Sequence, residues 1–156
     1  MNRILRDSVR NKTEARRSLV GIEALAILTS IHHLDELGVS FLVPALLIVG
    51  LPLVLMWWYL KKFSQAALWT YSTFVALVIL GFGVSDGLWN HTIKLIVFLS
   101  RGASSDVMAG LPFPPVGSPF HEVTGVLSLI AAVIAAFFGW RFVTPLARRA
   151  SGVVTQ

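Results

Sequence analysis

The sequence predicts an all-α integral membrane protein built as a bundle of four transmembrane helices. Hydrophobic residues make up 55% of the 156-residue chain and charged residues only 13%, whereas soluble domains carry roughly 25% charged residues. Four apolar segments are also long enough, at about 20 residues each, to cross the hydrocarbon core of a bilayer. The expected spans are residues 18–37, 39–60, 66–84 and 122–143.

The N-terminal segment, residues 1–17, is polar and contains six lysines and arginines. It is expected either as a basic tail that sets the topology or as a short interfacial helix on anionic lipid. The first span follows it directly, is interrupted by Glu23 and ends in the polar run 32–36, which reads His-His-Leu-Asp-Glu. The second span ends at two lysines, which mark the membrane surface.

The third span is followed by residues 92–100, which are apolar but too short to cross a bilayer. They either continue the third helix beyond the membrane or form a helix lying on it. Residues 101–120 are rich in Gly, Pro and Ser, and a loop of this length is usually functional or disordered. Because the loop is also apolar, we interpret it as a lid or a docking surface. The fourth span has a face of small residues suited to close helix packing, and residues 146–156 form a tail.

The distribution of basic residues predicts the orientation. With a cytoplasmic N-terminus, eleven lysines and arginines lie on the inner side and only Lys94 and Arg101 on the outer side, which selects N-in, C-in under the positive-inside rule. The transmembrane domain, residues 18–145, would then present an extracytoplasmic Pro/Gly-rich loop between spans 3 and 4. The expected location is a bacterial or archaeal cytoplasmic membrane. The expected partners are the lipid bilayer and a larger membrane complex or a homo-oligomer, with no nucleic acid.

All four histidines fall at the outer end of this bundle, with most of the carboxylates beside them. His32 and His33 end the first span, His91 follows the third and His121 precedes the fourth. Imidazole and carboxylate together suit copper, zinc or iron, and four-helix bundles build metal sites from facing helices. The predicted metal ligands are His33, His91, His121, Glu36, Asp86, Glu122 and His32. The chain has no cysteine, which excludes thiolate sites and disulfides.

The local spacings leave the roles of these residues open. His32 and Glu36 are four residues apart and would share a helical face, which leaves His33 pointing elsewhere. Asp86 and His91 are five apart, which does not place them on one α-helical face. Each group alone also fits a polar cap where a span meets water. A b-type haem held by His33 with His91 or with the histidine of span 4 is a second, lower-ranked interpretation.

Glu23 is a separate candidate because it lies inside the first span, about 15 Å along the helix axis from His33. An ionisable residue at that depth is a functional hypothesis by default. Its expected partners are Arg141, Tyr71 or Thr70. The two hypotheses are a proton relay, protonated at rest, and an inter-helix hydrogen bond or ion pair.

Three functions are compatible with these observations. The first is a small membrane metalloprotein, in one form an oxidoreductase acting on a lipid-soluble substrate. The second is a non-catalytic accessory subunit of a larger membrane complex. The third is an oligomeric transporter or channel that uses Glu23 and the outer acids as an ion path, although four spans are few for that role. Whether the protein is an enzyme is left open.

Overall fold

The computed structural model describes residues 3–102, 111–113 and 115–150, and every regular element within them is helical. The loop residues 103–110 and 114 and the last six tail residues lie outside the described part. In chain order, the helices are α1 (Arg3–Leu37), the 3₁₀ turn η1 (Gly38–Phe41), α2 (Leu42–Lys62), α3 (Gln65–Val78), the π-helix η2 (Ile79–Ile93), α4 (Lys94–Ser100) and α5 (Pro119–Ala150). The prediction of an all-helical fold is confirmed for these residues.

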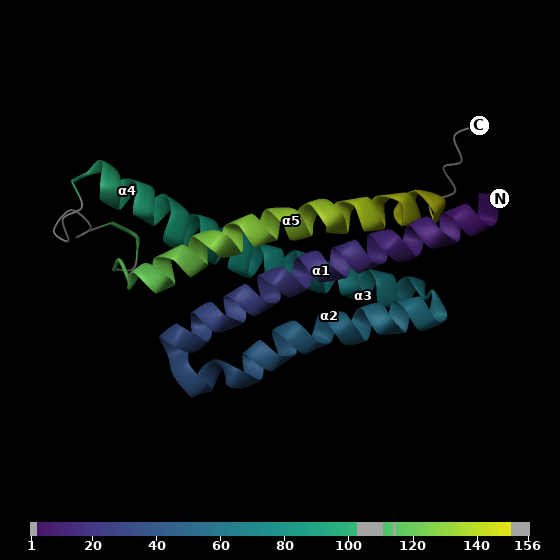
Figure 1. Ribbon diagram of the computed structural model, residues 1–156, viewed down its shortest axis with the longest axis horizontal. Coiled ribbons are helices and arrows are strands. Elements are labelled where there is room, and N and C mark those ends of the chain that lie inside the picture. The colour runs from purple at the N-terminus through teal and green to yellow at the C-terminus, as the bar shows by residue number, and fades with distance from the viewer. Residues whose placement is uncertain (1–2, 103–110, 114, 151–156) are drawn as a thin grey trace.

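Three helical stretches are long and apolar enough to cross a membrane: Asn11–Lys62, Gln65–Ser100 and Pro119–Leu146. The first of them contains both α1 and α2, and Figure 1 shows that the chain reverses direction between these two helices. The described N-terminal end of α1 and the C-terminal end of α5 lie at the same end of the molecule (Figure 1). The site described below lies at the opposite end, where α1 ends and α5 begins.

The helix ends follow from local sequence. Gly38 adopts the left-handed conformation with φ of 62° directly after α1, a conformation that glycine adopts without steric cost at the end of a helix. At the other reversal Phe63 has φ of 47°. Ser64 then caps α3, since its side chain accepts a hydrogen bond from the amide of Ala67 at 3.4 Å. Serine is among the preferred residues at this position.

The third helical stretch differs most from what its sequence suggested. The helix does not end near residue 84 but runs without a break from Gln65 to Ser100, so residues 92–100 continue it. Its middle part, η2, is a π-helix of 15 residues. Such helices are rare, occur mostly as single turns and are frequent at functional sites. Similarly, α1 begins at Arg3, so most of the basic N-terminal segment belongs to the same helix as the first span.

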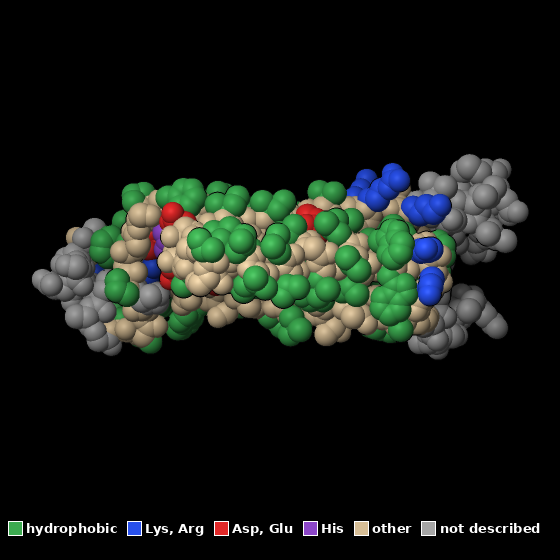
Figure 2. Space-filling model, turned by 90° about the horizontal axis from the view of Figure 1, so that it is seen from below, with side chains coloured by type: hydrophobic (Ala, Val, Ile, Leu, Met, Phe, Trp, Pro, Cys, Tyr) green, Lys and Arg blue, Asp and Glu red, His purple; other side chains and the backbone are tan. Residues whose placement is uncertain are grey.

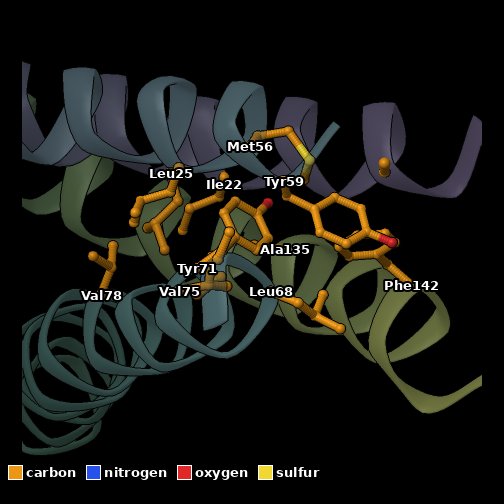
Figure 3. Close-up of a cluster of buried hydrophobic side chains, with 14 of the residues drawn as sticks. Ile22, Leu25, Met56, Tyr59, Leu68, Tyr71, Val75, Val78, Ala135 and Phe142 are labelled. Atoms are coloured by element: carbon orange, nitrogen blue, oxygen red, sulfur yellow. The ribbon is translucent and has the colours of Figure 1, made fainter. Parts of the chain in front are cut away.

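The apolar core lies between α1, α2, α3 and α5. Figure 3 shows Ile22 and Leu25 of α1, Tyr71 and Val75 of α3 and Ala135 of α5 pointing toward one another. Ala131, Ala132 and Ala135 are all buried, in agreement with the small-residue face expected for the fourth span. Small residues also bring η2 against α5, since a Cβ placed on Gly83 would collide with the Cβ of Ala132.

The charged side chains separate to the two ends of the molecule. In Figure 2 most of the visible lysines and arginines lie at one end, whereas the visible histidine and most of the visible acidic side chains lie near the other, with a small area of basic atoms beside them. Hydrophobic side chains cover most of the surface between them (Figure 2), and many are large and exposed, such as Leu46, Leu77 and Val133. An apolar belt bounded by polar ends is the surface that a bilayer requires.

Candidate metal centre

The four histidines meet at one end of the bundle, as the sequence predicted. The ring of His32, on α1, lies at the centre of the group. Its centroid is 4.0 Å from that of His121, 4.6 Å from that of His91 and 5.0 Å from that of His33. The rings of His91 and His121 are 4.9 Å apart. Three separate helical elements, α1, η2 and α5, therefore contribute imidazoles to one cluster.

The π-helix explains how Asp86 and His91 come together despite their spacing of five. In an α-helix this spacing places side chains on different faces, but the π-helix repeats its hydrogen bonds from residue i to i+5. The Nε2 atom of His91 lies 3.5 Å from Oδ1 of Asp86. One residue further along, the hydroxyl of Thr92 donates to the carbonyl oxygen of Gly87 at 2.8 Å, again over five residues. The argument from α-helical spacing therefore does not apply to this pair, because the segment is not α-helical.

The His32 side chain is buried and is hydrogen-bonded to other described residues through only one of its two ring nitrogens. The side chain is 1% exposed, and its Nδ1 lies 2.8 Å from the hydroxyl oxygen of Thr124. That hydroxyl already donates its single hydrogen to the backbone carbonyls of Phe120 and His121, at 2.8 and 3.1 Å. When that hydrogen points at a carbonyl, Thr124 accepts from Nδ1 of His32, and in this tautomer Nε2 carries a lone pair. This Nε2 is buried and has no hydrogen-bond partner within the described residues.

His91 is oriented in the same way, by a carboxylate. Its Nδ1 donates to Oε2 of Glu122 at 3.0 Å, and both side chains are buried. The other carboxylate oxygen, Oε1, accepts from the ammonium of Lys94 at 2.6 Å and from the amide of Gly117 at 2.6 Å. The buried charge of Glu122 is thus compensated by Lys94. A carboxylate that fixes the tautomer of a histidine and turns its other nitrogen inward is the usual outer-shell partner of a metal ligand.

Asp86 faces the Nε2 atoms of both His32 and His91. Its Oδ2 is 3.6 Å from Nε2 of His32, and its Oδ1 is 3.5 Å from Nε2 of His91. Both distances exceed the 2.7–2.9 Å or so of a charge-assisted hydrogen bond. Asn90 also donates to Oδ1 of Asp86 at 3.3 Å, across four residues. The Nε2 atoms of His32 and His91 and the carboxylate of Asp86 thus converge on one point, an arrangement that favours a cation there.

Two overlapping groups of side chains could hold a metal ion. One consists of His32, His91 and His121, the other of His32, His33 and Asp86, and within each group the ligand atoms lie within 4.8 Å of one another. The Nδ1 of His33 donates to the carbonyl of Thr29 at 3.1 Å, which leaves its Nε2 free. Because His32 belongs to both groups and offers only Nε2, the two groups describe alternatives for one ion.

Two glycines make room for the imidazoles. A Cβ on Gly125 would collide with the ring of His91, whose Nδ1 would be only 2.6 Å away. A Cβ on Gly117 would lie 2.8 Å from the ring of His121. Gly87, on η2, would place a Cβ 2.8 Å from the backbone nitrogen of Leu129. The close approach of η2 and α5 that these glycines allow is what positions His91 beside Glu122.

A pocket of about 350 Å³ opens beside the cluster. The pocket is lined by Asp35, Glu36, Asp86, Asn90, His91, Lys94, Pro115, Gly117, Ser118 and His121. The described part of the loop before α5 closes one side of it, since Lys94 also donates to the carbonyl of Pro115 at 3.2 Å. The rest of the predicted lid, residues 103–110 and 114, lies outside the described part.

The other sequence candidates occupy different places. Glu36 is exposed and lines the pocket without belonging to either metal group. Glu23 has a buried Oε1 with no partner among the described residues, and its expected partners bind elsewhere. Arg141 donates to Glu14 at 3.1 Å, and the Tyr71 hydroxyl pairs with that of Ser18 at 2.9 Å.

The sequence interpretation missed three residues that shape the site: Lys94, Thr124 and Gly125. Lys94 was counted only as an outer charge, yet it is 1% exposed. A lone lysine within an apolar run signals a buried counter-ion, and that signal was present. Thr124 and Gly125 carry no such signal, because their roles depend on which face of α5 meets the histidines.

No family of known proteins, no characterised protein sequence and no solved structure matches this chain. The fold and the site together define a helical protein with helices apolar enough for a membrane and a buried histidine cluster that could hold a metal ion.

Proposed function

We propose that this chain is a small membrane metalloprotein in which His32, His91 and His121 bind one transition-metal ion, and in which Asp86, which lies beside His32 and His91, moves in as the fourth donor. The observation that carries this proposal is the buried, unpartnered Nε2 of His32 facing Asp86 at 3.6 Å. With neutral imidazoles, Asp86 supplies the one uncompensated negative charge of this donor set, and a divalent cation would neutralise it.

The donor set selects the class of metal. Imidazole nitrogen with one carboxylate suits zinc, copper or iron, with no contribution from sulfur. A tetrahedral ion about 2.0–2.1 Å from each nitrogen would bring the nitrogens to about 3.4 Å from one another. The separations between the ligand atoms of the three histidines, at most 4.8 Å, would then shorten by up to about 1.4 Å through side-chain rotation. The direct contacts between the rings fill the space that a haem macrocycle would need between two axial ligands, so they favour a single ion over haem.

The membrane arrangement is part of the proposal. Four spans with both termini in the cytoplasm would place the histidines at the extracytoplasmic end. The reversal between α1 and α2 (Figure 1) and the separation of basic from histidine-bearing ends (Figure 2) support it. With copper or iron as the bound metal, the proposed reaction is oxidoreduction of a lipid-soluble substrate, since zinc supplies no redox chemistry. The pocket beside His91 and His121, which opens at the end of an apolar bundle, supports an accessible position on the ion.

Metal analysis of the purified protein tests the proposal. We expect about one equivalent of zinc, copper or iron per chain, retained through chromatography. A metal-free protein that binds no added divalent ion, and that copurifies with larger membrane subunits, would contradict it and support the accessory-subunit function.

Labelling of cysteines introduced at residues 11 and 101 from either side of the membrane tests the orientation. Only the cysteine at residue 101 should react with a reagent added from outside.

For Glu23 we propose a proton-relay role, supported by its buried Oε1 without a partner and by the cost of an ionisable group at membrane depth. An unpartnered polar atom destabilises the fold, so Glu23→Leu is expected to raise the midpoint of thermal unfolding without changing the metal content. Glu23→Gln should slow proton uptake into liposomes under an imposed pH gradient. A lowered unfolding midpoint in the Leu variant would show that the carboxyl group has a stabilising partner, and would contradict the assignment.

A further inference from the structure

Two carboxylates occupy a place where helices disfavour them. Asp35 and Glu36 lie in the last turn of α1, which contains no basic residue. The C-terminal end of a helix carries a partial negative charge, so acidic side chains there are unfavourable and lysine or arginine is preferred. Both side chains are exposed, and neither has a hydrogen bond or ion pair to another described residue. Local departures from such preferences tend to mark functional positions.

These carboxylates are connected to the proposed metal site by the pocket of about 350 Å³. They line its outer part, while Asp86, His91 and His121 line it on the side of the cluster. The one described lysine in the lining, Lys94, is compensated by Glu122 at 2.6 Å. The pocket is therefore negatively charged from its outer part to the ligands. His32 does not line the pocket, but its buried and unpartnered Nε2 lies 3.6 Å from Asp86, which does.

We propose that this pocket is the loading route of the metal site, and that Asp35 and Glu36 capture the hydrated divalent cation from water before the imidazoles bind it. This inference rests on the proposed metal-binding function. A cleft lined by charges of one sign between low-dielectric walls concentrates ions of the opposite sign and raises their association rate. The carboxylates would act through the ion's water shell, so they would set the rate of loading and not the final coordination. Loading would proceed from the histidine end, because the opposite end is rich in lysine and arginine.

Stopped-flow binding of Co²⁺ to the full chain in detergent tests this route, since bound Co²⁺ absorbs visible light. Neutralising both carboxylates, as Asp35→Asn with Glu36→Gln, is expected to lower the association rate on the order of tenfold at low ionic strength. The difference should largely disappear at about 1 M salt, where the Debye length falls to about 3 Å. The final spectrum and the stoichiometry should match those of the unmodified protein.

The matched control is Glu14→Gln compared with Glu36→Gln, because the same chemical change is made at opposite ends of the molecule. Only the second should slow Co²⁺ association. Since both outer carboxylates are exposed and unpaired, their neutralisation should leave the midpoint of thermal unfolding unchanged or raised. Equal association rates in all variants at low salt would overturn the loading route while leaving the metal site intact. An unmodified protein that binds no Co²⁺ would instead overturn the metal site itself, and the route with it.

Discussion

Replacing His91 or His32 with alanine is expected to lower the affinity for Zn²⁺ by more than about 100-fold. Loss of an outer-shell partner alone typically lowers metal affinity by about 10–100-fold, and these changes remove donors. The bare nitrogens of both side chains face Asp86 at 3.5–3.6 Å, so either loss leaves the site open. Competition with a chelating dye in detergent measures the dissociation constants.

Two further variants separate ligands from neighbours in this experiment. Thr124→Val removes the hydrogen bond that fixes the tautomer of His32 and should weaken Zn²⁺ binding by about 10–100-fold. His33→Ala should weaken it less, because the group of His32, His91 and His121 is retained. Helix content by circular dichroism and elution volume establish that each variant is folded. If folded His32→Ala and His91→Ala bound Zn²⁺ as tightly as the unmodified protein, the ligand assignment would be wrong.

The second large effect is expected from Gly125→Ala. Alanine in place of glycine normally stabilises a helix by roughly 0.5–1 kcal/mol. At position 125, however, the added methyl group would overlap the ring of His91, and overpacking of this kind costs about 1–3 kcal/mol. We therefore expect a lower unfolding midpoint together with weaker Zn²⁺ binding, because His91 must move away from Glu122 and the metal position.

Gly81→Ala is the matched control, since it adds the same methyl group in η2, where a Cβ has no neighbour within 4 Å. It should leave Zn²⁺ binding unchanged and the unfolding midpoint equal or higher. Thermal unfolding followed by circular dichroism, with and without Zn²⁺, compares the two variants. An increase in stability for both would contradict the packing of η2 against α5 and the position of His91.

The convergence of the histidines was predictable because it depends only on the alternation of helix direction. His32 and His33 end one long apolar segment, His91 follows another and His121 precedes a third, so any antiparallel arrangement brings them to one end. The burial of Ala131, Ala132 and Ala135 was likewise predictable from their small size and helical spacing. These inferences require only the positions at which the apolar segments end. They do not require the rotation of each helix about its axis to be known.

The details of the site depend on rotation and pitch, which the sequence pattern does not specify. The rotation of α1 decides that His32 lies at the centre of the cluster, whereas the sequence interpretation favoured His33. The π-helical pitch of η2 brings Asp86 close to His91, whereas the α-helical period of 3.6 residues per turn would place the two side chains on different faces. Glu122 was listed among the predicted ligands, whereas its bonds to Lys94 and His91 favour the role of a group that orients His91. Each of these outcomes is a tertiary effect on otherwise ordinary helical sequence.

X-ray absorption spectroscopy of the Zn²⁺-loaded protein tests the central claim most directly. We predict a shell of about four nitrogen and oxygen donors at about 2.0–2.1 Å, with scattering from three imidazole rings that falls to two in the folded His121→Ala variant. An ion surrounded by water oxygens, with no imidazole scattering and no change in that variant, would show that the histidine cluster does not bind the metal.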